Sequence, residues 1–237
     1  MLGESDSKPT ARLMGRSPVR TFVASLCFFR QALAVALVVS GCSVLSPKQD
    51  RTRFILLAPV TPGGSSNVQP SASSKLASVA IGLGPVQFPE YLDRPELVMR
   101  TSPNGFDLSE TNRWAEPLPD NFRHVLAADL TNLTGATNIV QYPWYPETRL
   151  DYIVHVQVQR FEADTNRDAQ LTARWDLRTL QSDQVLVSRE AHLTLPLTSL
   201  AGDAVAAALS EDVAELAGQI ASTIAQVEQQ SLARAPH

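Results

Sequence analysis

The chain has 237 residues, of which 44% are hydrophobic and 19% are charged, and its formal net charge is −4. These values are ordinary for a globular protein of one or two domains, and they exclude the strongly basic surface that nucleic-acid-binding proteins carry. The two cysteines, Cys27 and Cys42, fall in no Cys-X-X-Cys or Cys/His spacing. The sequence therefore predicts no metal site and no other cofactor.

Residues 1–41 have the organisation of a secretory signal peptide. Five basic and two acidic residues precede an apolar stretch, residues 32–39, that is too short to span a bilayer. The next residues complete the sequence Val-Ser-Gly-Cys, which resembles a bacterial lipobox and ends at Cys42. We expect Cys42 to carry the lipid; the alternative is an ordinary signal peptide with a chance cysteine. Met1 and Met14 both fit as the start of translation.

Removal of residues 1–41 would lower the net charge from −4 to −7, because five basic and two acidic residues are lost. The mature chain would contain no cysteine besides Cys42, so it could form no internal disulfide. Residues 42–51 are polar and predict a short lipidated tether, and residues 52–230 predict the folded domain. Each CH₂ group of an acyl chain buried in the membrane stabilises such an anchor by about 0.8 kcal/mol.

Four strands are predicted in the first half of the domain. A strand over residues 53–58 precedes a Pro-, Gly- and Ser-rich segment, residues 59–75, that predicts a flexible surface loop. A second strand is expected over residues 78–86, where glycines weaken the pattern. Strands over residues 96–101 and 105–109 flank a Ser-Pro-Asn-Gly turn, which predicts a hairpin.

The period of the apolar residues changes after this hairpin. Two prolines, Pro117 and Pro119, precede a helix that Asp120 is expected to cap and Gly135 to end. A short strand is expected over residues 138–141. The apolar residues at helical spacing are Phe122, Val125, Leu126, Leu130 and Leu133.

Three long strands are predicted next, over residues 151–161, 171–180 and 184–195. Their connections are short and polar, so we expect an antiparallel meander with one solvated face. Two sets of apolar residues alternate with polar ones and so share a face. The first set is Tyr152, Val154, Val156 and Val158, and the second is Leu171, Ala173, Trp175 and Leu177.

A long helix over residues 203–228 closes the predicted fold. Its apolar stripe favours packing against the hydrophobic face of the sheet, and the alternative is a coiled coil with a partner. The order of elements predicts an α+β fold: a single domain with a mainly antiparallel sheet and two principal helices packed on one face. The stripe consists of Val205, Leu209, Val213, Leu216, Ile220, Ile224 and Val227.

No motif in the sequence indicates catalysis. There is no Gly-X-Ser-X-Gly nucleophile elbow, and the glycines at positions 82 and 84 are not followed by a helix that could bind phosphate. We interpret the histidines as solvated surface residues without metal-ligand spacing. We therefore do not expect an enzyme. The histidines of the mature chain are His124, His155, His192 and His237.

Residues 89–117 combine prolines with the aromatic and arginine side chains that are enriched at protein interfaces. Proline restricts the backbone and so limits the entropy lost on docking. We expect this segment to bind a partner protein, although Tyr91 and Trp114 could instead fill the edge of the core. The predicted partner-binding residues are Tyr91, Leu92, Arg94, Asn112, Arg113, Trp114 and Glu116.

Two runs, PEYLDRPELVMR at residues 89–100 and NRWAEPLPDNFRHVLAADL at residues 112–130, resemble the signature of the PqiC-like family of ABC-type transport auxiliary lipoproteins. The YPW sequence at residues 142–144, the strands DYIVHVQVQRFE and ARWDL, and Cys42 fit the same family. The resemblance implies a non-catalytic lipoprotein on the periplasmic face of the outer membrane. It also implies an MCE-domain membrane protein with its ABC permease and ATPase as partners, and a homo-oligomer.

The function implied by this resemblance is that of an accessory subunit in an MCE-linked system that moves phospholipid or other hydrophobic molecules between membranes. Two alternatives stay open. The protein could be a direct periplasmic lipid carrier, with an acyl-chain pocket between the sheet and the long helix. It could also be a scaffold lipoprotein of another envelope assembly.

Overall fold

A computed structural model describes residues 50–60, 76–180, 182 and 184–234. The predicted signal peptide, Cys42 and nearly all of the tether lie outside the described residues, and so does most of the Pro-, Gly- and Ser-rich segment. The described residues from Arg51 on belong to one compact unit.

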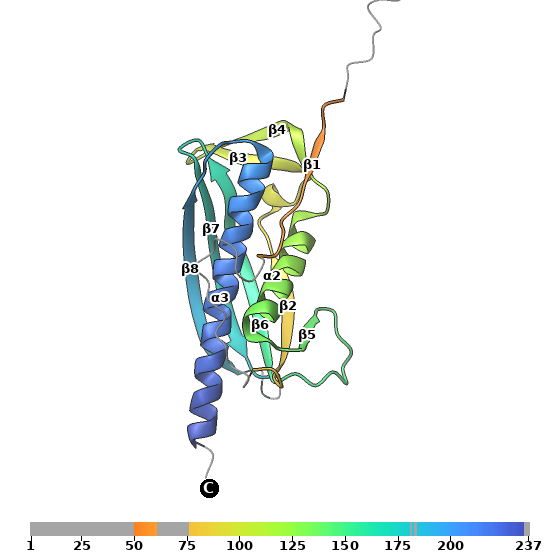
Figure 1. The fold of residues 1–237 in the computed structure, drawn as a ribbon, viewed down its shortest axis with the longest axis vertical. Coiled ribbons are helices and arrows are strands. Elements are labelled where there is room, and N and C mark those ends of the chain that lie inside the picture. Colours follow the sequence, from red (N-terminus) through yellow and green to blue (C-terminus); the bar gives the residue numbers. More distant parts are fainter. Residues whose placement is uncertain (1–49, 61–75, 181, 183, 235–237) are drawn as a thin grey trace, which may run out of the picture. The chain divides into compact units, whose positions relative to one another are not determined.

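Eight strands form one sheet that two helices cover (Figure 1). In the described part of the chain the helices are α2 (Leu118–Thr134) and α3 (Gly202–Arg234), and a 3₁₀ turn, η2, spans Glu90–Leu92. The strands are β1 (Arg53–Ile55), β2 (Ala80–Gln87), β3 (Glu96–Ser102), β4 (Gly105–Trp114), β5 (Asn138–Gln141), β6 (Tyr152–Asp164), β7 (Asp168–Arg178) and β8 (Val185–Pro196).

Strand β6 organises the sheet. On one side it pairs antiparallel with β7, which pairs antiparallel with β8. On its other side β6 pairs parallel with β2 near its start and with β3 near its end, so β2 and β3 follow one another along the same edge. Beyond them lie β5 next to β2, and β4 and then β1 next to β3. The sheet is mixed: the long strands pair antiparallel, whereas the parallel pairings involve the shorter ones.

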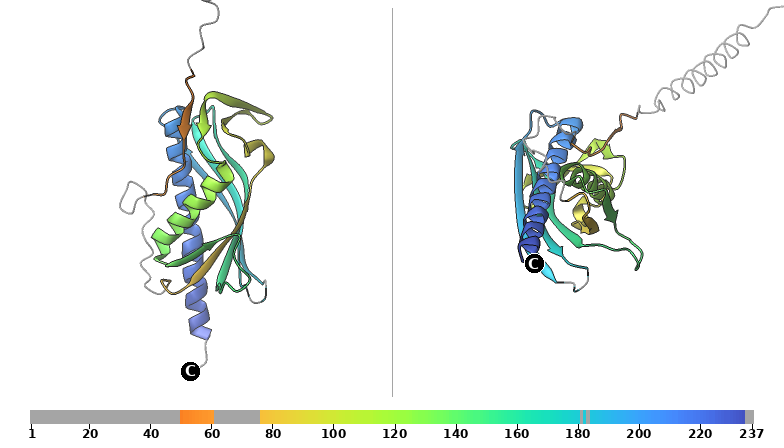
Figure 2. Two further views of the ribbon diagram at one scale, coloured as in Figure 1. Left: turned by 90° about the vertical axis from the view of Figure 1, so that its right-hand side faces the viewer. Right: turned by 60° about the horizontal axis from the view of Figure 1, so that its bottom comes forward.

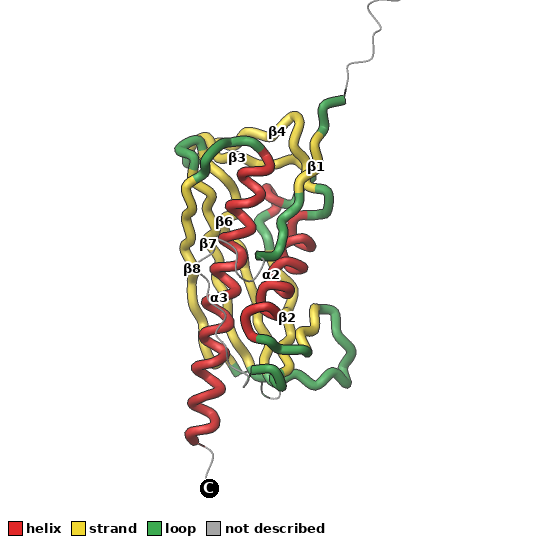
Figure 3. The backbone as a smooth tube through the Cα atoms, viewed as in Figure 1, coloured by secondary structure: helices red, strands yellow, loops and turns green. Residues whose placement is uncertain are grey.

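Both helices lie on the same face of the sheet, as the side view in Figure 2 and the tube in Figure 3 show. The predicted stripe of α3 is buried from Val205 to Ile224 with exposed fractions of 0%, and Val227 is half-buried. The stripe therefore packs against the core, and the α+β class with two helices on one face is confirmed. The meander β6–β7–β8 and the hairpin β3–β4 are also confirmed.

The ends of α2 show how local sequence sets its limits. Gly135 ends the helix as predicted, with a left-handed φ of 66°, and its N–H donates to the carbonyl of Thr131. The predicted cap is wrong: Pro117 occupies the N-cap position without a side-chain hydrogen bond. Asp120 lies inside the first turn, where it forms an ion pair with Arg123 at 2.9 Å. Proline fits the first turn because the N–H groups there have no partner within the helix.

The strand predicted over residues 53–58 is shorter in the structure and ends at Ile55. Beyond Ile55 the main chain bonds to side chains of the two helices instead of to a strand. The N–H groups of Leu57 and Val60 donate to Asn121 and Asp129 of α2, at 2.7 and 2.9 Å. The N–H of Ala58 donates to the Ser210 hydroxyl of α3, at 3.1 Å. Three polar side chains on the helices thus hold the segment that follows the tether.

A β-bulge changes the alternation of β6. The predicted inward face from Tyr152 to Val158 is confirmed, but the pairing with β7 shifts between Val158 and Arg160. The extra residue lets Phe161 and Ala163 continue the apolar face, so that Glu162 points to the opposite face. Glu162 is nevertheless buried, with 1% of its surface exposed.

Candidate functional site

The structure brings the two predicted partner-binding segments together at the start of β3 and the end of β4. The N–H of Trp114 donates to the carbonyl of Pro95 at 2.7 Å. Glu96 is the register partner of Arg113, and their side chains form an ion pair at 3.8 Å. Residues that are about twenty positions apart in the chain therefore share one surface.

Two of the seven predicted partner-binding residues are core side chains. Leu92 is 1% exposed and Trp114 is 5% exposed, so both fill the edge of the core. For Trp114 this agrees with the alternative interpretation, a core residue instead of an interface residue. Arg113 is exposed, and Arg94 is half-buried. Leu92 and Trp114 therefore position the segments, and their arginine neighbours supply the accessible surface.

The other members of this set have partners within the protein. The Asn112 side chain donates to the Ser109 hydroxyl at 3.0 Å, and it packs so closely against Gly202 that a Cβ added at Gly202 would lie 2.5 Å from its oxygen. Glu116 lies 2.9 Å from His124. Both side chains are half-buried and tie the end of β4 to the starts of the two helices.

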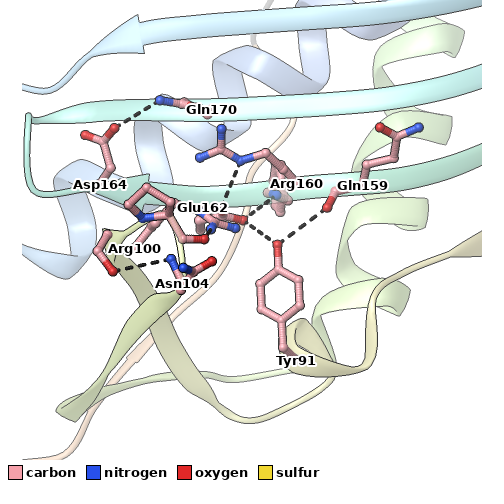
Figure 4. A network of polar contacts seen from close by, with 11 residues as sticks. Tyr91, Arg100, Asn104, Gln159, Arg160, Glu162, Asp164 and Gln170 are labelled. Atoms are coloured by element: carbon pink, nitrogen blue, oxygen red, sulfur yellow. Dashed lines mark hydrogen bonds and ion pairs between the residues drawn. The ribbon is translucent and has the colours of Figure 1, made fainter.

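Tyr91 belongs to a polar network centred on Glu162 (Figure 4). The Tyr91 hydroxyl donates to Oε2 of Glu162 at 2.9 Å. The guanidinium groups of Arg100 and Arg160 donate through Nε to Oε1, at 2.7 and 3.1 Å, and the N–H of Phe161 donates to Oε2 at 2.9 Å. Glu162 thus accepts four hydrogen bonds from groups on η2, β3 and β6.

Phe106 of β4 holds two members of this network in place. Its ring stacks on the ring of Tyr91 with a centroid distance of 4.6 Å, and the guanidinium of Arg100 lies 4.4 Å from its centroid. Both contacts are favourable for a ring with a negative face. Four chain segments therefore fix the orientation of the charged groups.

The electrostatics of the network favour a fixed set of charges. Burial raises the pKa of Tyr91 to about 12, and the charge of Glu162 and the hydrogen bond to it act in the same direction. Burial by itself would lower the pKa of Arg100, but the hydrogen bond to Glu162 and its charge outweigh that effect and raise it. At neutral pH Tyr91 is a neutral donor and Arg100 is a cation, so the network can hold a ligand but offers no nucleophile.

Sequence reasoning identified Tyr91 but missed Phe106, Arg100, Arg160 and Glu162. These residues lie on three strands, and each follows an ordinary strand pattern. Only Glu162 stands out in the sequence, because it is a carboxylate within the apolar end of a strand. The face to which its side chain points depends on a bulge that no local sequence feature marks.

Three of the predicted surface histidines are confirmed as such. The side chains of His124, His155 and His192 are 48%, 36% and 68% exposed, and each lies near a carboxylate. His237 lies outside the described residues. Within the described parts of the chain, no group of three or more His, Cys, Asp and Glu side chains could hold a metal ion.

Among the residues that the structure describes, neither α2 nor α3 is both long enough and apolar enough to cross a membrane.

Comparisons with known proteins place this fold. The sequence profile described as "ABC-type transport auxiliary lipoprotein component" matches residues 61–221. Protein XCC0632 from Xanthomonas campestris has a similar fold, with a TM-score of 0.61 and 17% identity over 77% of this chain and 100% of its own. An uncharacterized protein has a TM-score of 0.58 and 20% identity over 73% of this chain and 99% of its own. No curated protein shows significant sequence similarity.

Proposed function

The chain belongs to the family of ABC-type transport auxiliary lipoprotein components, and we propose that it is a non-catalytic accessory lipoprotein of an envelope transport system. The observation that carries this proposal is the family match over residues 61–221. The surface formed by the start of β3 and the end of β4 supports it, because two segments with interface-type side chains lie side by side there.

In this proposal the lipid on Cys42 restricts the domain to the membrane surface. Restriction raises the effective concentration of the domain toward a partner embedded in the same envelope. The tether after Cys42 has nine residues, Ser43 to Arg51, and they reach at most about 30 Å. The partner-binding surface therefore works within a short distance of the anchor.

Arg94 and Arg113 would make the contacts with the partner. Arg113 is exposed and its ion pair with Glu96 is long, at 3.8 Å, so it can exchange Glu96 for an acidic group on the partner at little cost. The Nε of Arg94 is buried and has no hydrogen-bond partner among the described residues. A partner that displaces the groups covering this nitrogen would gain by supplying the missing acceptor.

The finer assignment rests on the sequence runs at residues 89–100 and 112–130. They support a PqiC-like protein on the periplasmic face of the outer membrane, with an MCE-domain protein and its ABC permease and ATPase as partners. The cargo would be phospholipid or another hydrophobic molecule, and the protein would form a homo-oligomer. A direct lipid carrier has less support, because buried side chains of the core fill the space between the sheet and the two helices.

Affinity purification of the tagged, full-length protein from membranes, followed by mass spectrometry of retained proteins and lipids, tests this function. We expect an MCE-domain protein with its permease and ATPase. Recovery of a different envelope machine would replace the transport role with the scaffold role. Recovery of bound phospholipid without any partner protein would favour the carrier.

A double variant, Arg94→Ala with Arg113→Ala, tests the docking surface. We expect it to reduce recovery of the partner about tenfold or more while the protein remains folded, since each charge-assisted contact contributes about 1.5–3 kcal/mol. Arg189→Ala removes an exposed arginine from β8 and serves as the matched control. Undiminished recovery with the double variant would exclude these two residues from the interface.

A further inference from the structure

A polar cleft lies beside the Glu162 network and has no role in the function proposed above. It has a volume of about 550 Å³ and opens between the β3–β4 turn and the β6–β7 turn. Arg100 and Arg160 line it together with Thr101, Ser102 and Asp164. The main chain connects the two sides, because the N–H of Thr165 donates to the carbonyl of Arg100 at 3.2 Å. The cleft is therefore built by elements that are fixed to one another.

The two carboxylates in or beside the cleft already have their hydrogen bonds. Glu162 accepts four, from Tyr91, Arg100, Arg160 and the N–H of Phe161. Asp164 accepts three: from the N–H groups of Asn166 and Asp168, at 2.9 and 3.1 Å, and from the Gln170 side chain at 3.0 Å. Both acids therefore serve the structure of the network and of the β6–β7 turn.

Several donors of the cleft, by contrast, have no acceptor among the residues that the structure describes. Arg160 contacts Glu162 through Nε alone, so within the described chain its two Nη groups have no acceptor. Arg100 uses Nε for Glu162 and Nη1 for the carbonyl of Pro103, which leaves Nη2. The Ser102 hydroxyl accepts from the N–H of Asn104 at 3.3 Å, so its own proton can be donated. The cleft thus has satisfied acceptors and a surplus of donors.

The two guanidinium groups are also held side by side. Both Nε atoms contact the same oxygen, Oε1 of Glu162, and the Arg100 group is further held by the ring of Phe106. A guanidinium whose position is already fixed loses little entropy when it binds an oxyanion, and its planar donors suit phosphate and carboxylate oxygens. Glu162 therefore orients the donors of the cleft.

We propose that this cleft binds a phosphate-ester group, between the free guanidinium donors of Arg100 and Arg160 and the hydroxyls of Ser102 and Thr101. A carboxylate has two oxygens, which one guanidinium can satisfy. A phosphate ester offers more acceptor oxygens, and these match donors from two guanidiniums and two hydroxyls. Asp164 also lines the cleft, and its negative charge opposes a very large negative charge on the ligand, which favours a monoester or diester over a polyphosphate.

This inference goes beyond the transport role, because it depends only on the cleft. A phosphate ester could reach the protein as a lipid headgroup or as a soluble molecule, and the chemistry of recognition is the same. The two sources are separated by experiment.

Isothermal titration of the full-length lipoprotein in micelles of a nonionic, phosphate-free detergent tests the proposal, with sn-glycerol 3-phosphate as the probe and acetate as the carboxylate comparison. We expect saturable binding of glycerol phosphate and at least about tenfold weaker binding of acetate. Arg160→Gln should weaken glycerol phosphate binding about tenfold or more, because it removes both unused Nη donors. Arg174→Gln, on the exposed surface of neighbouring β7, is the matched control and should bind as the unmodified protein does.

Arg160→Gln leaves Glu162 with three donors, and a melting curve shows whether it folds. If it does not, Ser102→Ala at an exposed position takes its place, and a twofold to fivefold loss is expected. Equal or tighter binding of acetate, no saturable binding at millimolar glycerol phosphate, or an equal loss in Arg174→Gln would overturn the proposal. Phosphatidylglycerol added to the micelles then identifies the source: weaker apparent affinity for glycerol phosphate indicates a lipid headgroup, and unchanged affinity a soluble ester.

Discussion

Two buried carboxylates in this protein have opposite surroundings. Glu162 in the sheet is surrounded by four donors, two of them guanidinium groups. Asp212 in α3 is 0% exposed, and neither of its carboxylate oxygens has a hydrogen-bond partner among the described residues. The buried carboxylate in the sheet is therefore compensated by hydrogen-bond donors, whereas the buried carboxylate in α3 has no donor among the described residues.

Burial without hydrogen-bond donors raises the pKa of a carboxyl group. Desolvation raises the pKa of Asp212 to about 8, and the neighbouring charges of Glu211 and Glu215 raise it further. Asp129 of α2 is an intermediate case: Val60 donates to one of its oxygens while the other has no partner, and burial raises its pKa to about 6. The pKa of Asp129, which has one donor, is therefore raised less than the pKa of Asp212, which has no donor and two acidic neighbours.

The largest effect is expected from Glu162→Gln. This change removes the charge that compensates Arg100 and Arg160, and it leaves four donors around a neutral amide that has only one acceptor oxygen. We expect the free energy of unfolding to fall by about 3 kcal/mol, which is typical when one member of a buried ion pair is lost. Urea unfolding measures it. Glu190→Gln, at a half-exposed side chain on β8, is the matched control and should change the stability by less than about 0.5 kcal/mol.

Asp212, which is buried without hydrogen-bond donors, should make the free energy of unfolding depend on pH. Its pKa is near 3.8 when unfolded and about 8 when folded, so between these pH values the folded state binds more protons than the unfolded state. The free energy of unfolding contributed by Asp212 therefore falls as the pH rises from about 4 to about 8, by at most about 1.4 kcal/mol per pH unit. Asp129 acts in the same direction up to about pH 6.

Asp212→Asn should reduce this slope, because an amide does not titrate. Urea unfolding at pH 5 and pH 8 compares the two proteins. We expect the substitution to increase the free energy of unfolding more at pH 8 than at pH 5. Glu110→Gln, at an exposed position on β4, is the control for a general loss of negative charge. An identical difference between the two pH values in Asp212→Asn and the unmodified protein would contradict the raised pKa.

The smallest effect is expected from Tyr91→Phe. It removes one of the four donors to Glu162 but keeps the ring that stacks on Phe106. We expect a loss of about 1 kcal/mol, the usual contribution of a single hydrogen bond. Tyr142→Phe, at a side chain that is 47% exposed, should be neutral. A loss as large as that of Glu162→Gln would mean that Tyr91 holds the whole network.

Elements whose pattern is local could be predicted from the sequence. The stripe of α3, the alternation of β7 and the end of α2 at Gly135 follow from the periodicity of buried residues and from one residue that tolerates positive φ. The hairpin β3–β4 was found because turn residues mark it. The cap of α2 could not be predicted in this way, since prolines and an aspartate in the first turn allow more than one N-cap residue.

The sequence by itself determined the order of the elements, the faces that α2, α3 and β7 bury, and the family. Only the tertiary structure decided which strands meet: β2 and β3 along one edge of β6, and the bulge that turns Glu162 away from the core. It also decided that Trp114 is a core side chain and that Arg100 and Arg160 meet at one oxygen. The physical reason is that periodicity is a property of neighbours in the chain, whereas the partner of a strand or a buried charge comes from a distant segment.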